Sequence, residues 1–487
     1  MAAPEMSGAA KFYTINLVRK MSTTIAAIAT ALSPSGIGII RISGDEAVTI
    51  ADRIFRKPNG EKLKDALTHT VHYGHIVEGA GSETEHDIDE VMVVLMRAPH
   101  SFTREDTVEI DCHGGIYVVK RILDLCFAAG AVPATPGEFT KRAFLNGRID
   151  LSKAEAVMDL ISSSNEKARI NSMNQLNGRL YDVILSLRQK LIYEIAYIES
   201  AIDDPEHYDT EDFKTRLLTV CAECEEKLNK LIASFDNGKI IQHGIQTTIV
   251  GKPNVGKSSF LNLLLGEERA IVTQVAGTTR DTLEETVSLD GVTLRLIDTA
   301  GIHETSDEVE MIGVKKAKDS IEKADLVIFL LDSSDALNED DKNMVTLLYG
   351  KKVIALLNKT DMEENITDEE KVKALFSSFD EEVKILPFSA KTATGLTELT
   401  EYIKELFFKG ELKSDEEICL TSLRHKNLAV DAANALKQVE ASLKDDMPED
   451  FYSIDLMQAY ASLGAIIGEE VDDDLVDEIF SKFCMGK

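Results

Sequence analysis

Four short polar segments, in a fixed order along the chain, carry the residues best suited to chemistry. They are GKPNVGKS at 251–258, DTAG at 298–301, NKTD at 358–361 and SAK at 389–391. Glycines in the first segment allow backbone amides to surround phosphate groups, Lys257 brings a positive charge to them, and the Ser258 hydroxyl is suited to Mg²⁺. The first segment therefore predicts a phosphate-binding loop.

The later segments indicate which base is bound. Asp361 follows an apolar run, where its carboxylate can accept hydrogen bonds from both N1–H and N2–H₂ of guanine; ATP would leave that carboxylate unpaired. Asp298 also follows an apolar run and can hold the metal through water, while Gly301 leaves room for its amide to approach the γ-phosphate. The order and spacing of the segments therefore predict a GTP site. The predicted GTP contacts are Asn254, Val255, Gly256, Lys257, Ser258, Ser259, Thr273, Gln274, Val275, Ala276, Gly277, Thr278, Thr279, Asp298, Thr299, Ala300, Gly301, Asn358, Lys359, Asp361, Ser389, Ala390 and Lys391.

The sequence indicates less directly which groups would catalyse hydrolysis of the bound GTP. Small GTPases carry a water-orienting glutamine after DTAG, whereas Ile302 and His303 stand here. Thr279 could close on Mg²⁺, and Asn254 together with carbonyls of the 273–278 loop could form an oxygen cage for K⁺, whose charge would replace an arginine finger. Alternatively, Asn254 simply fits its loop and the later segment is a flexible switch. Spacing alone leaves both interpretations open.

Strands and helices alternate over the elements that must position these segments, up to about Phe408, which is typical of a parallel α/β domain. Runs at 285–289 and 292–297 flank Asp290 and Gly291, which predicts a hairpin with a tight turn. Helical spacing covers 151–202 and 213–235 and returns after 423, while Asp236, Asn237 and Gly238 favour a hinge. The sequence therefore predicts a helical domain interrupted by a GTPase domain.

The first part of the chain, from Thr24 to about Gly130, mixes strand-like and helical runs and predicts an α+β domain. Residues 1–20 lack the long apolar stretch of a secretory signal, so an upstream start or a vector-derived remnant is favoured over an organellar leader. No apolar run has membrane-spanning length. The net charge of −31 excludes broad, nonspecific nucleic-acid binding, so an RNA partner must meet a local basic patch or a second protein.

Further segments give the chain a specific resemblance over almost its whole length, from about Met21 to Lys487. They are TIAAIAT at 24–30, GIGIIRISG at 36–44, SFTRED at 101–106, HGG at 113–115, PGEFTKRAFLNG at 136–147, AGTTRD at 276–281 and FCMGK at 483–487. With these motifs the chain resembles the tRNA-modification GTPases of the MnmE/TrmE type. Met485, where isoleucine is usual, and Pro34 with Ser35 ahead of Gly36 depart from the family pattern.

The resemblance implies a multidomain fold. Residues 21–137 would form an N-terminal α+β domain that binds a tetrahydrofolate and dimerises, 138–240 with 411–487 a discontinuous all-α helical domain, and 241–410 an inserted Ras-like α/β P-loop GTPase domain, with 1–20 outside all three. It further implies a cytoplasmic homodimer without a membrane role. An FAD-binding partner that uses NADH would complete a heterotetramer acting on tRNA.

The implied activity is GTP hydrolysis with Mg²⁺, driven by K⁺-dependent dimerisation of the GTPase domains. It is coupled to addition of a carboxymethylaminomethyl or aminomethyl group to C5 of the wobble uridine, with a carbon from 5-formyl- or methylene-tetrahydrofolate. The family's positions transfer to this sequence as follows: folate at Arg41, Glu109, Arg142 and Lys487; K⁺ at Asn254, Thr273, Val275 and Thr278; Mg²⁺ at Ser258 and Thr279; and catalysis at Glu310, which would orient the attacking water, and Arg280.

Two alternatives remain open from the sequence. Glu109 suits the guanidine-like edge of a pterin, but a structural ion pair would also place a carboxylate there. The chain could also be a regulatory GTPase of ribosome assembly without modification chemistry of its own. A KH-like GXXG element or a strongly basic tail would favour that function, and the sequence has neither.

Overall fold

The structure is a computed structural model that describes residues 23–79, 81–203, 210–267, 285–297, 318–363, 365–379, 383–408, 418–469, 471 and 473–486. The chain divides into two compact units, one formed by Met1–Met158 with Ile467–Lys487 and the other by Asp159–Ile466. Each unit contains its own sheet and its own buried core. The bounds of the three domains expected from the sequence stay a prediction.

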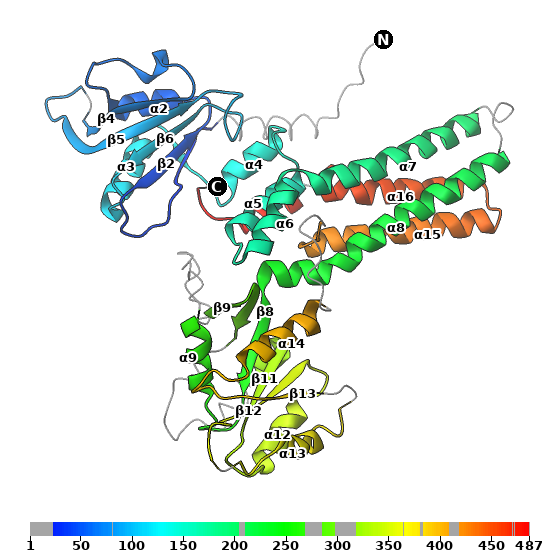
Figure 1. The fold of residues 1–487 in the computed structure, drawn as a ribbon. Helices are drawn as coiled ribbons and strands as arrows, with labels where there is room; N and C mark the ends of the chain where they lie inside the picture. Colours follow the sequence, from blue (N-terminus) through cyan, green and yellow to red (C-terminus); the bar gives the residue numbers. More distant parts are fainter. Residues whose placement is uncertain are drawn as a thin grey trace. The chain divides into compact units, whose positions relative to one another are not determined.

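A seven-stranded sheet, in the order β3-β4-β5-β6-β2-β1-β7, forms the centre of the first unit (Figure 1). Its strands are β1 (Ile25–Ile28), β2 (Gly38–Ser43), β3 (Phe55–Arg56), β4 (Thr70–Glu78), β5 (His86–Met96), β6 (Thr107–Cys112) and β7 (Val132–Pro133). Neighbouring strands are antiparallel, except that β1 and β7 are parallel. The α+β character predicted from the sequence is confirmed.

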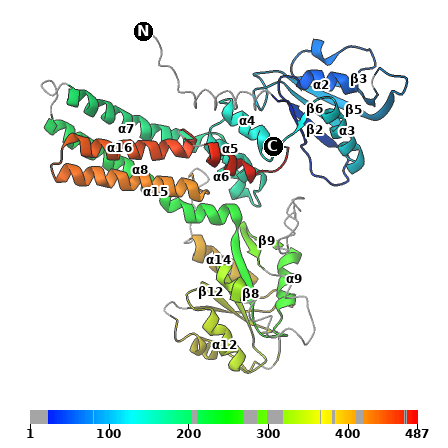
Figure 2. The same ribbon diagram turned by 180° about the vertical axis from the view of Figure 1, so that it is seen from behind.

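One face of this sheet is covered by α2 (Ala47–Ile54) and α3 (Ile116–Ala128), which lie together over it in Figure 2. Ile40 and Ile42 of β2 belong to the same buried cluster as residues of both helices. Because side chains alternate along a strand, Arg41 lies on the opposite face. The sheet therefore separates a helix-covered side from a side that carries charged groups.

The C-terminal end of the chain packs within this first unit. Helices α4 (Glu138–Leu145), α5 (Leu151–Ile161) and α17 (Asp473–Ser481) share a cluster that includes Phe144 and Phe480. Gly137 has φ +67°, and a Cβ there would lie 2.6 Å from the carbonyl oxygen of Phe480. A glycine before α4 is therefore required both by the backbone and by this close approach.

Long helices form part of the second unit. They are α6 (Glu166–Leu176), α7 (Arg179–Asp203), α8 (Thr210–His243), α15 (Leu423–Lys444) and α16 (Glu449–Ile467), and the last four run side by side in both ribbon views (Figures 1 and 2). The hinge predicted at Asp236, Asn237 and Gly238 is wrong, because α8 continues through all three. A Cβ on Gly238 would lie 2.2 Å from the carbonyl oxygen of Leu420, so this glycine permits close packing.

A six-stranded sheet in the order β13-β12-β11-β8-β10-β9 forms the rest of the second unit, which we call the G region. Its elements are β8 (Ile245–Val250), α9 (Lys257–Glu267), β9 (Glu285–Leu289), β10 (Val292–Leu296), β11 (Leu326–Asp332), α12 (Glu339–Leu347), β12 (Val353–Asn358), α13 (Glu369–Leu375), β13 (Lys384–Pro387) and α14 (Leu396–Phe408). All pairs are parallel except the β9–β10 hairpin, which is confirmed with Asp290 and Gly291 at positive φ.

Both faces of the G region sheet are buried. In β11, Ile328 and Leu330 belong to the cluster that contains residues of α9 and α14, whereas Phe329 and Leu331 belong to the cluster with α12 and α13. This explains the continuous apolar runs of the sequence, because a parallel sheet between two helical layers has no solvent-facing side. Ligands of such sheets bind at the carboxyl ends of the strands.

In the part of the chain that the structure describes, no helix has both the length and the apolar character needed to cross a membrane.

Candidate functional site

The loop after β8 has the backbone of a phosphate cradle. Gly251, Asn254 and Gly256 all have positive φ, at +151°, +63° and +101°. A Cβ on Gly251 would lie 2.5 Å from the carbonyl oxygen of Leu330, so the loop passes directly over β11. Asparagine tolerates the left-handed region better than most residues with a side chain, which explains Asn254 between the two glycines.

Lys257 lies at the start of α9 and folds back over this loop. Its Nζ donates to the carbonyl oxygens of Gly251 at 2.8 Å and Lys252 at 2.7 Å. Burial lowers the pKa of this ammonium group. The adjacent helix N-terminus adds unpaired amides, so the loop, the lysine and the helix together present positive potential to an anion.

A second lysine anchors the loop from outside. Lys252 Nζ lies 2.8 Å from the carboxylate of Asp341 and 3.8 Å from that of Asp335. The side chain of Asp341 is 1% exposed and also accepts from the backbone of Asn338, in a capping box at the start of α12. This ion pair joins the loop to α12 and so fixes the loop at a second point besides Lys257. The sequence motif gave no signal of it.

Asn358, at the end of β12, ties three segments together. Its Nδ2 donates to the carbonyl oxygen of Val255 at 2.7 Å, and its Oδ1 accepts from the amide of Ala390 at 3.0 Å. The side chain is buried, so both bonds are shielded from water. The structure thus brings the phosphate loop together with the NKTD and SAK segments.

The guanine-reading carboxylate predicted from the sequence is held by a neighbour. Ser389 Oγ donates to Oδ1 of Asp361 at 2.7 Å and also accepts from the amide of Thr392 at 3.3 Å. Asp361 itself is exposed. A carboxylate oriented in this way can accept two parallel N–H donors from a ligand.

Lys359, which lies between Asn358 and Asp361 in the sequence, has φ +68° and donates from Nζ to Asp332 at 2.5 Å. Burial acts to raise the pKa of Asp332, but hydrogen bonds from Lys359 and Ser334 outweigh it, so the pKa of this carboxyl is lowered. The charged Asp332 therefore fixes the lysine stem beside the base-reading segment.

The remaining predicted contacts of this site lie outside the described residues. They are Thr273, Gln274, Val275, Ala276, Gly277, Thr278, Thr279, Arg280, Asp298, Thr299, Ala300, Gly301 and Glu310. Of the predicted metal positions, the structure therefore describes Asn254 and Ser258, both exposed at the loop.

A second group of predicted residues lies on the sheet face opposite α2 and α3, which we call the open face; the ring of Phe139 from α4 lies beside Arg41 there, 5.6 Å from its guanidinium carbon. Arg41 of β2 and Glu109 of β6 are direct neighbours across the two strands, and Arg41 Nε donates to Glu109 Oε1 at 2.7 Å. The same guanidinium donates to the carbonyl oxygen of Gly486 at 3.2 Å. The predicted C-terminal contribution therefore reaches this pair through Gly486, while Lys487 lies outside the described residues.

Arg142 of α4 is linked to β2, the strand of Arg41, through the carboxylate of Glu105. Its guanidinium, 3% exposed, donates to both oxygens of Glu105 at 3.0 and 3.2 Å and to Glu138 at 2.9 Å. Glu105 also accepts from Ser43 Oγ at 2.8 Å, two residues beyond Arg41 on β2. Arg142 is thus placed near the pair but engaged by two carboxylates, neither of which was predicted.

Known protein families match both the N-terminal part of the chain and the part that contains the helices and the G region. The family model described as GTP-binding protein TrmE N-terminus matches residues 24–148, and the MnmE helical domain model matches residues 151–484. The protein named tRNA modification GTPase MnmE from Lachnoclostridium phytofermentans is 52% identical over 465 residues, which cover 95% of this chain and 99% of that protein. The chain belongs to the MnmE/TrmE family of tRNA modification GTPases. The resemblance predicted from the sequence is confirmed.

Other MnmE proteins agree at similar coverage. Those of Acetivibrio thermocellus and Geobacillus thermodenitrificans are 48% and 47% identical, each matched over 95% of this chain and 99% of their own length. Among solved structures, a variant of Era from Aquifex aeolicus bound to GDP and AlF₄⁻ is 30% identical and covers 39% of this chain and 66% of that one, with a TM-score of 0.26. The MnmE/TrmE assignment therefore depends on the whole-length relatives.

One further polar group of this MnmE/TrmE chain was missed from the sequence. Asp111 lies two residues after Glu109 on β6, hence on the same sheet face. Its Oδ1 is buried without a hydrogen-bond partner among the described residues, and burial, followed by the nearby Glu109, raises the pKa of this carboxyl. The signal was available in the alternation of TVEIDC, which sets two carboxylates side by side.

Proposed function

We propose that this chain hydrolyses GTP and uses the cycle to modify the wobble uridine of tRNA, adding a carboxymethylaminomethyl or aminomethyl group at C5. The observation that carries the proposal is the joining of the phosphate loop to the base-reading segments through Asn358, with Asp361 held by Ser389. Membership of the MnmE/TrmE family of tRNA modification GTPases supports a reaction on tRNA.

Nucleoside mass spectrometry of tRNA tests this function most directly. Cells lacking the protein should lose the wobble-uridine modification, and the wild-type chain should restore it. An unchanged modification pattern together with defective ribosome particles would instead support the alternative, a regulatory GTPase of ribosome assembly.

In the mechanism we propose, the loop amides and Lys257 hold the β- and γ-phosphates of GTP while Asp361 reads the base. Ser258, with Thr279, would hold Mg²⁺, whose chemistry is to neutralise charge that develops on the phosphate oxygens. Because the Ser258 hydroxyl is exposed at the start of α9, the donor fits a hard cation. Asp298 would join through water, and Arg280 is a further candidate for charge stabilisation.

We further propose that K⁺ activates hydrolysis, held by Asn254 and by Thr273, Val275 and Thr278. Asn254 is exposed within the phosphate loop, and its side-chain oxygen is of the type that suits an oxygen-ligated cation. GTP turnover is expected to be at least about tenfold faster in K⁺ than in Na⁺ buffer of equal ionic strength; equal rates would contradict the proposal. Glu310 would orient the attacking water, and an unchanged rate in Glu310→Ala would remove it from the mechanism.

The open face of the first unit is the proposed tetrahydrofolate site. Its carboxylates fit the donor-rich edge of a pterin, because Asp111 has a buried acceptor oxygen with no partner in the described part of the chain and Glu109 is only partly occupied by Arg41. Arg41 and Arg142 would bring positive charge for the glutamate portion of the ligand, with Lys487 from the C-terminus. The bound folate would supply the one-carbon unit.

Replacing Glu109 with Ala is expected to weaken binding of 5-formyltetrahydrofolate about a hundredfold or more, because the variant loses an acceptor and leaves Arg41 without its carboxylate. Isothermal titration calorimetry measures the change. Glu78→Ala is the matched control, since that carboxylate, at the end of β4, pairs with Arg121 of α3. Unaltered affinity in Glu109→Ala would show that the pair with Arg41 is structural.

The proposed assembly is a homodimer that binds an FAD-dependent, NADH-using partner and tRNA in the cytoplasm. These partners follow from the family alone and stay predictions. Size-exclusion chromatography with light scattering measures the dimer, and a purely monomeric chain at micromolar concentration would contradict it. Copurification from cells tests the flavoprotein.

A further inference from the structure

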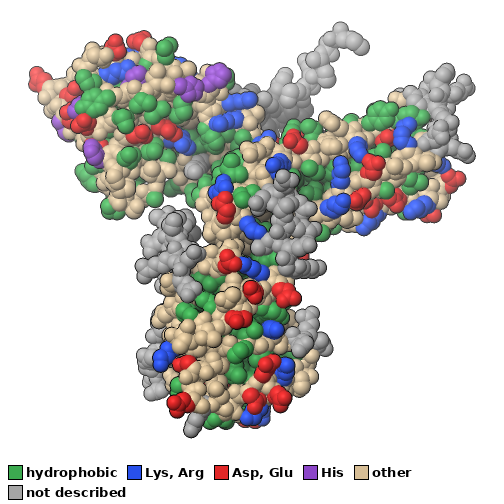
Figure 3. Space-filling model, in the orientation of Figure 1, with side chains coloured by type: hydrophobic (Ala, Val, Ile, Leu, Met, Phe, Trp, Pro, Cys, Tyr) green, Lys and Arg blue, Asp and Glu red, His purple; other side chains and the backbone are tan. Residues whose placement is uncertain are grey.

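A dense basic segment in this acidic chain has no part in the sites described above. Of the twelve residues from Arg53 to Lys64, five are Lys or Arg and one is acidic, whereas the whole chain has a net charge of −31. Figure 3 shows basic and acidic side chains interspersed over the long helices and the G region on one face. The basic segment is therefore an exception to the charge pattern of the molecule.

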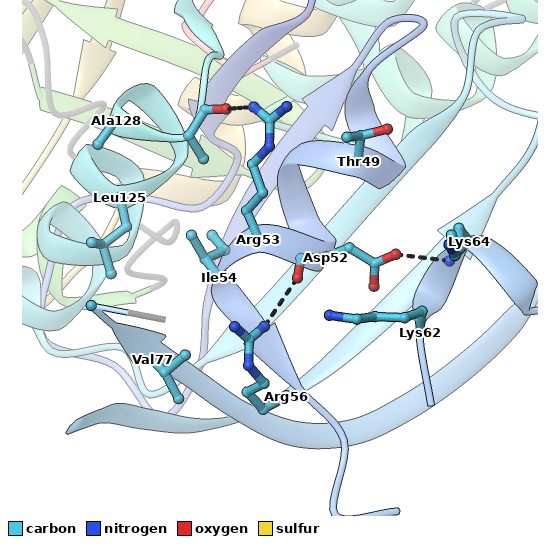
Figure 4. A pocket seen from close by; sticks show the side chains of 12 residues that line it. Thr49, Asp52, Arg53, Ile54, Arg56, Lys62, Lys64, Val77, Leu125 and Ala128 are labelled. Carbon is cyan, nitrogen blue, oxygen red and sulfur yellow. Dashed lines mark hydrogen bonds between the residues drawn. The ribbon is translucent and has the colours of Figure 1, made fainter. Parts of the chain in front are cut away.

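This segment surrounds a pocket of about 620 Å³ at the end of α2. Arg53, Arg56, Lys62 and Lys64 line it, together with apolar side chains that include Val77 of β4 and Leu125 of α3. Figure 4 shows Arg53, Arg56 and Lys62 around one hollow, with Leu125 and Val77 on its other side. A volume of this size accepts a ligand much larger than a single phosphate ion.

Backbone carbonyl oxygens hold two of the basic groups of the pocket in place. Arg56 Nη1 donates to the carbonyl oxygens of Asp52 at 3.0 Å and Phe55 at 2.9 Å, and Arg53 Nη1 donates to that of Ala129 at the end of α3. Backbone carbonyls therefore orient both guanidinium groups through Nη1, and Nη2 of Arg56 faces Glu85 at 4.0 Å.

The one carboxylate of the lining is engaged elsewhere. Asp52 accepts backbone N–H groups from Leu63 at 2.6 Å and Lys64 at 3.0 Å, which holds η1 (Leu63–Asp65) against α2. Within the described ranges, no carboxylate lies at ion-pair distance from Arg53, Lys62 or Lys64, whereas Nη2 of Arg56 forms a long ion pair with Glu85 at 4.0 Å. With four basic side chains and one carboxylate in its lining, the pocket has a net positive charge, which suits a ligand with several negative charges.

The pocket is also separate from the candidate folate site. Its lining comes from α2, α3 and η1 on the helix-covered side of the sheet, whereas Arg41 and Glu109 lie on the open face. The positive charge continues to Lys57 beside the pocket, and Arg53, Lys62 and Lys64 are exposed, so a large molecule can reach them.

We propose that this pocket binds phosphate groups of an RNA backbone, and that it is a docking point for the tRNA substrate. The inference rests on the proposed function. The pocket explains how an RNA could bind so acidic a chain. Phosphate contacts require clustered Lys and Arg, and four such side chains are clustered in this pocket. The apolar wall beside the guanidinium groups offers a surface for a ribose or a base.

The test uses the full-length chain and an unmodified tRNA transcript whose anticodon begins with uridine. Lys62→Ala/Lys64→Ala is expected to bind the transcript about tenfold more weakly near 100 mM salt and to lower the log–log salt slope by about 2. Both side chains are exposed and make no described side-chain hydrogen bond, so the fold and basal GTP turnover should not change. Fluorescence anisotropy over a salt series measures the affinity.

Two control variants make the result specific. Lys62→Arg/Lys64→Arg keeps the charge and should retain the affinity. Lys371→Ala/Lys373→Ala removes two exposed lysines with the same spacing from α13, where Asp368 and Glu369 already pair with them, and should bind as the wild type does.

The outcomes separate the proposals. Undiminished affinity in Lys62→Ala/Lys64→Ala, beside a wild type that binds, overturns the pocket and leaves the proposed function standing. A wild type that does not bind the transcript contradicts both. If inorganic phosphate binds the wild type but not Lys62→Ala/Lys64→Ala, while both bind tRNA equally, the pocket takes a free phosphorylated ligand and the RNA proposal is wrong.

Discussion

The Asp361→Asn variant is expected to lose at least about a thousandfold in affinity for GTP and to bind xanthosine triphosphate in its place. The wild-type carboxylate can accept both N1–H and N2–H₂ of guanine, while Ser389 holds its Oδ1 at 2.7 Å. An asparagine directs an NH₂ group toward one of those donors, which costs a hydrogen bond and adds a repulsive contact. Xanthine has an oxygen where guanine has the amino group, so it complements the amide.

Competition binding with a fluorescent GTP analogue measures both affinities. Asp368→Asn is the matched control, because Asp368 is the exposed N-cap of α13 and asparagine caps a helix equally well. It should keep the affinity and the preference of the wild type. Retention of guanine preference in Asp361→Asn would show that the base is read elsewhere.

The parts of the G region that could be predicted are those fixed by local pattern. Apolar runs end at Val250, Leu357 and Phe388, each immediately before a motif, and the structure has the parallel strands β8, β12 and β13 there. The Asp290–Gly291 turn was predictable for the same reason, since two successive residues at positive φ strongly favour this pair. Alternation and turn chemistry act over a few residues, so a single sequence records them.

The parts that could not be predicted depend on contacts distant in sequence. Gly238 resembled a hinge because glycine is rare inside helices, but its partner, Leu420, is visible only after folding. The Lys252–Asp341 pair is of the same kind, since neither residue belongs to a pattern that involves the other. In the first unit, Arg142 was predicted as a ligand-binding residue, yet the two carboxylates that hold it gave no signal.

Gly256→Ala is expected to reduce nucleotide affinity by about a hundredfold or more, although the change adds a single methyl group. Gly256 has φ +101°, where an alanine is strained, and its Cβ would lie 2.4 Å from Nδ2 of Asn358. Asn358 cannot turn aside without breaking its bonds to Val255 and Ala390, which are 2.7 and 3.0 Å long. The variant must therefore distort the loop or release the tie among three nucleotide-binding segments.

A second glycine of the same region tests whether this effect is local. Gly266 lies in α9, and a Cβ there would meet no atom of the described residues within 4 Å, so Gly266→Ala should keep nucleotide affinity and raise the free energy of unfolding by up to about 1 kcal/mol. Calorimetric titration and thermal unfolding of both variants measure the two effects. If Gly256→Ala bound GTP normally, Asn358 would be free to move, and the tie that carries the proposed function would not be required for binding. Gly256→Ala is expected to lower nucleotide affinity because the backbone and Asn358 both exclude a side chain at 256. Gly266→Ala is expected to leave affinity unchanged and to stabilise the fold, because neither the helix nor a described neighbour excludes a side chain at 266.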